Sequence, residues 1–242
     1  ICDNILLAQD LMRDYHKHNG KPRAAAKVDL MKAYDTVCWE FLFNLLHVLH
    51  FPPTMVTWIK ACVTSPKYSI NFNGESIGYI KGARGLRQGD PISPYLFVII
   101  MDFLDQIFKH EIAATASFEY HWRCEKLAIS HLCFADDLLI FLDGTVQSAE
   151  TVRKVLNKFY EFTGLLANNS KSCLFLSAVN DETTLSIGQV MQFTLGKLPV
   201  RYLGVPLISN KLTKRDCAEL TKKITNRILS WNSKFLSYAG SV

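Results

Sequence analysis

Some features that would place this chain in a specialised class are missing. The seven cysteines are an odd number and no two stand at the close spacing of a zinc-ligand pair, which argues against a disulfide framework and a zinc knuckle. No apolar run approaches the roughly 20 residues that a membrane-spanning helix needs. No signal peptide, internal repeat or low-complexity segment is visible either. Together these absences favour a globular protein of a reducing compartment.

The composition is that of a soluble globular protein. Of the 242 residues 49% are hydrophobic and 20% are charged, which is enough to bury a proper core. The net charge of +5 is mild and points only weakly to a polyanionic partner. Basic residues are frequent from Lys197 to Lys234, which on composition alone fits a solvated helix face. Because the chain opens on Ile1 in an already helical pattern, we expect it to be a fragment of a longer product.

Three acidic residues stand in two segments with suitable neighbours for a metal site. Asp29 ends an apolar run, and apolar residues flank Asp136 and Asp137 on both sides. The second segment predicts strand, tight turn, strand, with the carboxylates at the tip. Burying such carboxylates together is costly unless a cation neutralises them, and Mg²⁺ prefers oxygen ligands of this kind. Metal-assisted phosphoryl transfer is therefore the chemistry that these residues indicate.

The periodicity of apolar residues predicts helices and strands without βαβ regularity, so an α+β fold is expected. Helices are predicted over 3–18, from Asp35 or Thr36 to about His50 and, after a break at Pro52-Pro53, as a second short helix to about Val63. Further helices are predicted from Ile92 to about Ile112, over 148–162 and over 213–230. Strands are predicted over 24–30, 68–74 with an Asn-Gly turn, 77–83, on both sides of Asp136–Asp137, over 173–177 and as a hairpin at 201–207.

A loop at residues 84–94 is rich in glycine, arginine, glutamine, aspartate and proline. It supplies two guanidinium groups, an amide and glycines that allow close backbone approach, and it leads into a helix start. Helix N-termini and glycine turns favour phosphate or sugar oxygens. Each acidic segment taken singly fits a structural cap or hairpin tip, but their combination with this loop favours a nucleotide site.

In this combination the chain resembles the reverse transcriptase domain of a non-LTR retrotransposon, most closely the plant LINE type, with group II intron maturases as more distant relatives. The matching segments are motif A at 27–35, motif B at 85–97, motif C at 134–137, motif D at 164–172, the primer-grip hairpin at 202–207 and a thumb start at Trp231 and 236–240. The resemblance implies a right-hand polymerase palm with partial fingers and the start of a thumb. A single domain would span 1–242, with 1–23 and about 36–90 as partial fingers and palm, 24–35 and 91–207 as mainly palm, and 208–242 as thumb.

The resemblance further implies an RNA-directed DNA polymerase that adds deoxynucleotides to a primer 3′-hydroxyl by two-metal-ion phosphoryl transfer. The residues implied to hold two Mg²⁺ ions are Asp29, Asp136, Asp137 and, through its carbonyl, Leu30. The residues implied for the nucleotide are Tyr34, Gln88, Gly89 and Lys171, and those for template and primer are Arg87, Tyr202, Leu203 and Gly204. The implied partners are an RNA template, a DNA primer or target DNA and deoxynucleoside triphosphates. The implied location is intracellular, in the nucleus, the cytoplasm or both, and the oligomeric state stays open.

Structural alternatives remain for single residues. Tyr34 occupies the family's steric-gate position, where an aromatic ring excludes a ribose 2′-hydroxyl, but it also fits a core aromatic. Arg87 fits a surface salt bridge nearly as well as a template contact. Lys171, a possible general acid for pyrophosphate, fits an ordinary lysine after a turn. The basic helix at 213–230 fits duplex phosphates or plain solvation.

Two rival functions also remain. Family members carry fingers before the point where this chain begins, and the thumb breaks off early, so a truncated or domesticated relic that binds nucleic acid without polymerising is one alternative. An RNA-dependent RNA polymerase is the other, although Tyr34 and Phe134–Ala135 argue against it. Neither an endonuclease nor a ribonuclease H segment is recognised in these residues.

Overall fold

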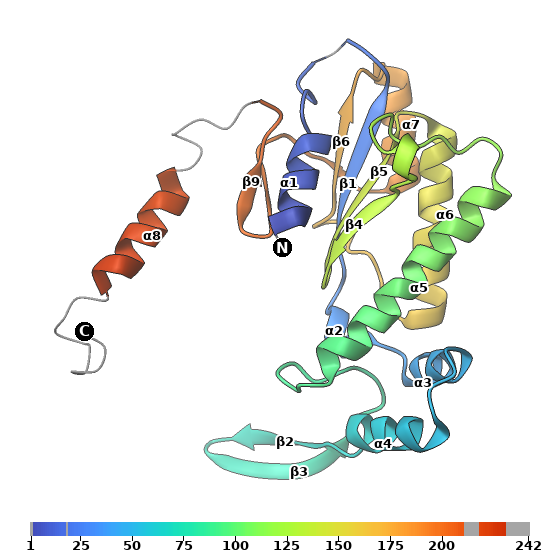
Figure 1. Ribbon diagram of the computed structural model, residues 1–242. Coiled ribbons are helices and arrows are strands. Elements are labelled where there is room, and N and C mark those ends of the chain that lie inside the picture. The colour runs from blue at the N-terminus through green and yellow to red at the C-terminus, as the bar shows by residue number, and fades with distance from the viewer. Residues whose placement is uncertain (1, 18, 211–217, 231–242) are drawn as a thin grey trace. The chain divides into compact units, whose positions relative to one another are not determined.

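The computed structural model describes residues 2–17, 19–210 and 218–230 (Figure 1). The chain divides into two compact units, of which the larger covers residues 17–196 and the smaller covers 1–16 with 197–242. Asp29, Asp136 and Asp137 all belong to the larger unit.

A five-stranded sheet forms the centre of the larger unit. Its strands are β1 (Arg23–Asp29), β4 (His131–Phe134), β5 (Asp137–Asp143), β6 (Cys173–Ser177) and β7 (Thr194–Leu195). Their order is β4-β5-β1-β6-β7, and only the β6–β7 pair is parallel. Helices and a mainly antiparallel sheet are mixed without regular βαβ units, which confirms the α+β prediction.

Strand β1 lies in the middle of the sheet because its side chains suit burial. Ala24, Ala26 and Val28 are fully buried in one core cluster with residues of the neighbouring helices. Side chains alternate between the faces of a strand, so Lys27 and Asp29 point to the opposite face. The strand register, from Arg23 opposite Asp143 to Asp29 opposite Asp137, follows from this alternation.

The described part of the larger unit also contains six α-helices. They are α2 (Ala33–Thr36), α3 (Trp39–Val48), α4 (Pro53–Thr64), α5 (Ser93–Ala114), α6 (Val146–Thr163) and α7 (Asp181–Met191), with a short 3-10 helix, η1, at Glu125–Leu127. Thr145 caps α6 by accepting a hydrogen bond from the Ser148 amide, and Gly164 ends it in a left-handed conformation. The helix predicted at 92–112 exists as α5 at 93–114, and the helix predicted at 148–162 exists as α6 at 146–163.

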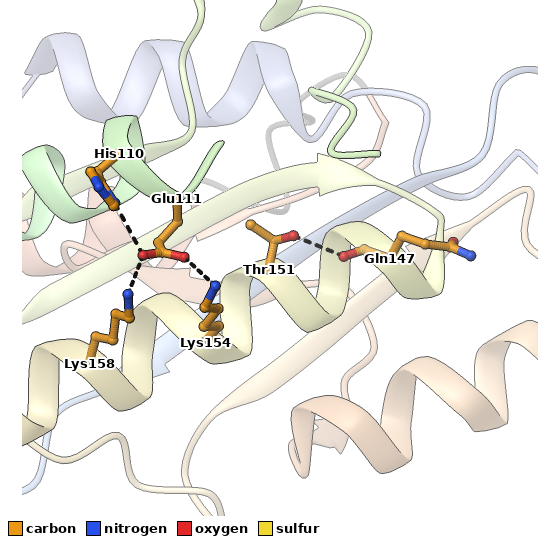
Figure 2. A network of polar contacts seen from close by, with 6 residues as sticks. All are labelled: His110, Glu111, Gln147, Thr151, Lys154 and Lys158. Atoms are coloured by element: carbon orange, nitrogen blue, oxygen red, sulfur yellow. Dashed lines mark hydrogen bonds and ion pairs between the residues drawn. The ribbon is translucent and has the colours of Figure 1, made fainter. Parts of the chain in front are cut away.

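Helices α5 and α6 lie side by side against the sheet and are joined by a polar cluster around the buried Glu111 (Figure 2). Glu111 of α5 is 1% exposed, and its carboxylate receives Lys158 at 2.5 Å and Lys154 at 2.8 Å, both from α6. The neighbouring His110 places Nδ1 3.2 Å from the same carboxylate. The two lysine contacts hold the pKa of Glu111 well below its ordinary 4.5, at about 2, against the opposing effect of burial. The glutamate is therefore charged at neutral pH and ties the two helices together.

The prediction of one helix from Asp35 or Thr36 to about His50 is wrong. The chain forms two helices, α2 and α3, separated by extended backbone at Val37 and Cys38. The Cys38 amide donates to the Thr163 carbonyl at 2.8 Å, and the Val37 carbonyl accepts from Gly85 at the same distance. These bonds to distant segments require an extended backbone, so tertiary contacts override the local helical pattern.

The segment from Pro53 to Lys81 matches its prediction more closely. Helix α4 ends at Thr64, and the hairpin of β2 (Lys67–Phe72) and β3 (Glu75–Lys81) follows. Its turn residues Asn73 and Gly74 have φ values of 51° and 87°, as an Asn-Gly hairpin turn requires. Helix α7 was not predicted, although Asn180 caps it by accepting from the Thr183 amide at 2.7 Å.

The smaller unit joins the start of the chain to its later part. Its elements are α1 (Cys2–Leu11), β8 (Val200–Tyr202), β9 (Val205–Leu207) and α8 (Ala218–Ser230). The Gln9 side chain donates to the Ile208 carbonyl at 2.7 Å, which fastens α1 to the segment after β9. The predicted helix at 3–18 ends early, because Asp14 adopts a φ of 68° and donates to the Ser209 carbonyl.

The hairpin predicted at 201–207 is present as β8 and β9, with Leu203 and Gly204 in the turn. Of the predicted helix at 213–230, residues 218–230 are helical as α8. Residues 211–217 and the expected thumb start at Trp231 and 236–240 lie outside the described residues. Among the helices described, none combines the length and the apolarity needed to cross a membrane.

Candidate functional site

The three aspartates come together at one end of the sheet. Asp29 is the last residue of β1 and pairs directly with Asp137, the first residue of β5. Asp137 also pairs with Phe134 of β4, so Ala135 and Asp136 form a two-residue hairpin turn. Ala135 takes a left-handed φ of 52° in this turn. Directly opposite residues of antiparallel strands have Cα atoms about 4.5–5.5 Å apart, so the two paired aspartates are immediate neighbours.

The electrostatics of the sheet end show how close these charges lie. Partial burial raises the pKa of Asp137, and the negative charges of Asp136 and Asp29 raise it further. Lys27 acts in the opposite direction, with its Nζ 4.0 Å from the Asp137 carboxylate. Neighbouring negative charges that raise the pKa of a carboxyl group also attract a cation, whose binding would stabilise the ionised carboxylates.

The donor atoms suit a hard divalent cation, although their side chains are not converged. Within residues 2–17, 19–210 and 218–230, no three His, Cys, Asp or Glu side chains are gathered closely enough to hold a metal ion. Carboxylates that lie close together repel each other, and a divalent cation bound between them would offset this repulsion. Burial and the two nearby aspartates raise the pKa of the Cys133 thiol to about 11. The carboxylate and carbonyl oxygens of the aspartates and Leu30 are hard donors of the kind that Mg²⁺ prefers.

A segment after α6 fixes the backbone of Asp29 from the side opposite β5. The Asn168 amide donates to the Asp29 carbonyl at 2.7 Å, and the Asp29 amide donates to the Ser172 hydroxyl at 3.1 Å. Ser172 is fully buried, and the Asn168 side chain accepts from the amides of Ser170 and Lys171 and so holds the turn between them. Asn168 and Ser172 were noted only as part of motif D, and their contact with Asp29 is a positioning role that the sequence did not indicate.

The same pattern orients the Leu30 carbonyl. The Met31 amide donates to the Leu166 carbonyl at 2.8 Å. Backbone groups of Asp29 and Met31 therefore bond to residues 164–168 along one edge of the extended chain. Carbonyl groups alternate between the two edges of an extended chain. The carbonyl of Leu30 therefore faces the edge on which Asp137 lies.

Tyr34 lies beside this sheet end. Its ring stacks on Phe97 of α5 with the ring centroids 4.8 Å apart and an interplanar angle of 15°, and its carbonyl accepts from the Leu86 amide. Partial burial raises the pKa of Tyr34 above its ordinary 10.0, and the charge of Asp136 adds to this rise. The ring thus packs against the core and also lies within electrostatic reach of Asp136.

The loop at 84–94 is fastened next to α2. The Gly85 carbonyl accepts from the indole of Trp39 at 2.6 Å, and a Cβ added to Gly85 would lie 2.6 Å from the Asp35 carbonyl oxygen. Glycine is therefore required there by space as well as by its φ of 94°. Arg87 forms an ion pair with Asp90 at 2.6 Å, as its structural alternative anticipated. The loop is therefore positioned by Gly85 and by Trp39 of α3, and the Asp90 side chain accepts from the Ile92 amide just before α5.

The remaining predicted residues are placed in two ways. Gln88 and Gly89 are exposed in the loop, and Lys171 is exposed in the turn of motif D. Tyr202, Leu203 and Gly204 belong to the β8–β9 hairpin of the smaller unit, where the Tyr202 side chain is buried. The larger unit alone therefore brings together the three aspartates, the Leu30 carbonyl and Tyr34.

Two solved structures of telomerase have a similar fold. A structure of apo telomerase from Candida tropicalis superimposes with a TM-score of 0.57 at 11% identity, over 88% of this chain and 39% of that chain. A structure of telomerase from Candida albicans, in complex with a fragment of telomeric RNA, does so with a TM-score of 0.56 at 13% identity, over 92% of this chain and 36% of that chain. At such identities the likeness shows the fold alone, which is the palm-like α+β fold of a polymerase.

Residues 2–207 match the family model described as reverse transcriptase (RNA-dependent DNA polymerase). The chain belongs to the reverse transcriptase family, and within it to the domains of non-LTR retrotransposons. It is 28% identical over 170 residues to the Pol polyprotein of the type-2 retrotransposable element R2DM of Drosophila melanogaster, which covers 70% of this chain and 15% of that protein. It is 24% identical over 232 residues to the Pol polyprotein of the type-1 element R2 of Popillia japonica, which covers 92% of this chain and 37% of that protein.

A shorter match involves a plant protein. An uncharacterized mitochondrial protein of Arabidopsis thaliana is 37% identical over 65 residues, which are 27% of this chain and 53% of that protein. The chain spans well under half the length of the two retroelement polyproteins that it matches.

Proposed function

We propose that this chain is the catalytic domain of an RNA-directed DNA polymerase that adds deoxynucleotides to a primer 3′-hydroxyl. The observation that carries the proposal is the pairing of Asp29 with Asp137 at the sheet end, beside Asp136 in the hairpin turn. Membership of the reverse transcriptase family supports the reaction, and the polymerase-like fold supports the position of the site.

The three aspartates and the Leu30 carbonyl would hold two Mg²⁺ ions. When bound, such ions lower the pKa of an attacking hydroxyl and neutralise charge on the phosphates. The chain's own contribution is position. Asn168 and Ser172 hold the Asp29 backbone from one side while β5 holds it from the other. Lys27 limits the repulsion around Asp137 without entering the donor set.

The nucleotide would lie between the sheet end and the loop at 84–94. Tyr34 would exclude a ribose 2′-hydroxyl, since stacking on Phe97 prevents its ring from turning aside. Gln88 and Gly89 would line the pocket, where the glycine lets the backbone approach closely. Lys171 would face the leaving pyrophosphate as a general acid.

Arg87 would contact the template after leaving its ion pair with Asp90, and Tyr202, Leu203 and Gly204 would position the primer end. The partners would be an RNA template, a DNA primer or target DNA, and deoxynucleoside triphosphates. We place the protein in the nucleus, the cytoplasm or both, because a retroelement polymerase must meet RNA and chromosomal DNA. The domains would be assigned as in the family, with 24–35 and 91–207 mainly palm.

We also assign the chain to the plant LINE type. The stretch shared with the Arabidopsis protein supports this assignment. Hybridisation of a probe from the coding sequence to genomic DNA of plants and of insects would test it, and a signal confined to insect DNA would contradict it.

The decisive test is primer extension on an RNA template with an annealed DNA primer, deoxynucleotides and Mg²⁺. Asp136→Ala should reduce extension by roughly 10³-fold or more, because the loss of a metal ligand removes several kcal/mol of stabilisation. Asp136 is exposed in a turn, so fold and hybrid binding should persist. Asp29→Asn should behave alike, and Glu150→Ala, an exposed carboxylate on α6, should extend as the wild type does. Extension that survives in Asp136→Ala would refute the metal assignment.

A further inference from the structure

A groove on the larger unit lies away from the candidate catalytic site. It has a volume of about 670 Å³ and is bounded by α3, α5 and the end of α6. None of the three aspartates nor Tyr34 lines it. A separate pocket, lined by Tyr34, Phe134 and Ala135, lies along another face of α5. An occupant of the groove would therefore leave the aspartates accessible.

Three phenylalanines form the apolar floor of the groove. Phe41 and Phe103 have ring centroids 4.9 Å apart, and Phe162 lies 6.3 Å and 5.6 Å from them. Phe162 is 52% exposed and Val48, at the open end, is 70% exposed. Aromatic clusters left open in this way are the usual anchors of protein interfaces.

The walls of the groove have the geometry of a helix-packing surface. Phe41, Leu45 and Val48 follow each other on α3 at helical spacing, as do Ile99, Phe103 and Gln106 on α5. Such rows of side chains accept the ridge of a further helix. The shape therefore suits an amphipathic helix that lays its apolar face between α3 and α5.

The charged residues that line the groove favour a positively charged helix. Its charged lining residues are Glu40, Asp102 and Glu161. Among the described residues that line the groove, none is lysine, arginine or histidine. Residues 17–196, the larger unit, hold 17 lysine and arginine residues and 17 aspartate and glutamate residues, so their charge is balanced and the lining of the groove is a local acidic patch. A helix with lysine or arginine flanking its apolar face would be attracted here.

We propose that the groove between α3, α5 and α6 docks a basic amphipathic helix of another protein. The apolar face would cover Phe41, Phe103 and Phe162, and its basic residues would pair with the acidic patch. Because Asp136 and Tyr34 lie outside the groove, the partner would be held while the candidate polymerase site stays open.

The test uses a labelled synthetic helix of about 18 residues, with leucine at its heptad a and d positions and lysine on its flanks, and a matched peptide with glutamate for lysine. Fluorescence anisotropy should show the lysine peptide binding the wild type at least ten-fold more tightly than the glutamate peptide. The double variant Asp102→Lys with Glu161→Lys should reverse this preference. Equal binding of both peptides, or a preference that the charge reversal leaves unchanged, would overturn the proposal.

Two exposed valines, Val48 of α3 inside the groove and Val98 of α5 outside it, test whether the peptide binds in the groove. Val48→Asp should weaken binding of the lysine peptide at least ten-fold, whereas Val98→Asp, at a position that is 64% exposed outside the groove, should leave it unchanged. Equal loss in both variants would count against the groove. Sedimentation of the wild type provides a second check. A dimer that Val48→Asp abolishes would show that a second copy of the chain covers the groove, and would overturn the proposed partner.

Discussion

Replacing Glu111 with glutamine should destabilise the larger unit in a way that depends on pH. The carboxylate is 1% exposed, and the contacts with Lys154 and Lys158 lower its pKa from 4.5 to about 2. Each pKa unit corresponds to about 1.4 kcal/mol, so the fall from 4.5 to about 2 sets an upper limit of about 3.5 kcal/mol. The two lysines are 56% and 39% exposed, and solvent screening reduces the expected loss to roughly 1–2 kcal/mol.

The sign of the pH dependence follows from the lowered pKa. The folded protein favours the ionised glutamate, so its contribution is complete above pH 4.5 and disappears as the pH falls towards about 2. Urea unfolding of wild type and Glu111→Gln, followed by circular dichroism, should therefore show a difference at pH 7 that shrinks between pH 5 and pH 3.

The matched control for this prediction is Asp105→Asn on the same helix. Its carboxylate pairs with Lys109 at 2.6 Å, but the lysine side chain is 67% exposed and the pair lies on the surface. This variant should unfold almost as the wild type does at every pH. A difference between wild type and Glu111→Gln that stays constant with pH, or that is absent at pH 7, would refute the role assigned to the ion pairs of Glu111.

Three further substitutions test the site. Tyr34→Ala should raise the ratio of ribonucleotide to deoxynucleotide incorporation at least ten-fold in primer extension, and an unchanged ratio would contradict the steric gate. Ser172→Ala should lower stability by about 1–2 kcal/mol in urea and slow extension at unchanged hybrid affinity, because the Asp29 amide loses its acceptor. Gly85→Ala should lower the Tm more than Gly89→Ala, because both glycines have a positive φ but only a Cβ on Gly85 would lie 2.6 Å from a carbonyl oxygen. Equal losses of Tm would mean that backbone strain alone is the cause.

Local patterns were enough to predict much of the palm. Strand β6 at Cys173–Ser177 has the predicted bounds, because its short apolar run stands between turn residues. The hairpin at Asp136 and the turn at Asn73–Gly74 were likewise readable, since turn chemistry is local. These features depend on neighbours in the chain, which the sequence displays directly.

Contacts between distant segments were not readable in the same way. The break at Val37–Cys38 depends on a bond to Thr163, and the anchoring of Asp29 depends on Asn168 and Ser172. Nothing in the local pattern around either segment shows that these backbones meet. Helix α7 was missed for another reason, because its cap at Asn180 was the main signal and its apolar residues recur weakly. The roles of single site residues remain predictions that the proposed variants test.

The position of β1 in the sheet has a consequence for synthesis on the ribosome. The strand is made early, but both of its partners, β5 at Asp137–Asp143 and β6 at Cys173–Ser177, are made much later. Until then an apolar strand has two unpaired edges, which is the condition that favours mispairing between nascent chains. A copy of the element interrupted before residue 172 would encode Asp29 without the hydroxyl that holds its amide. The aspartate codon would survive in such a copy, while the structure that gives the residue its position would not.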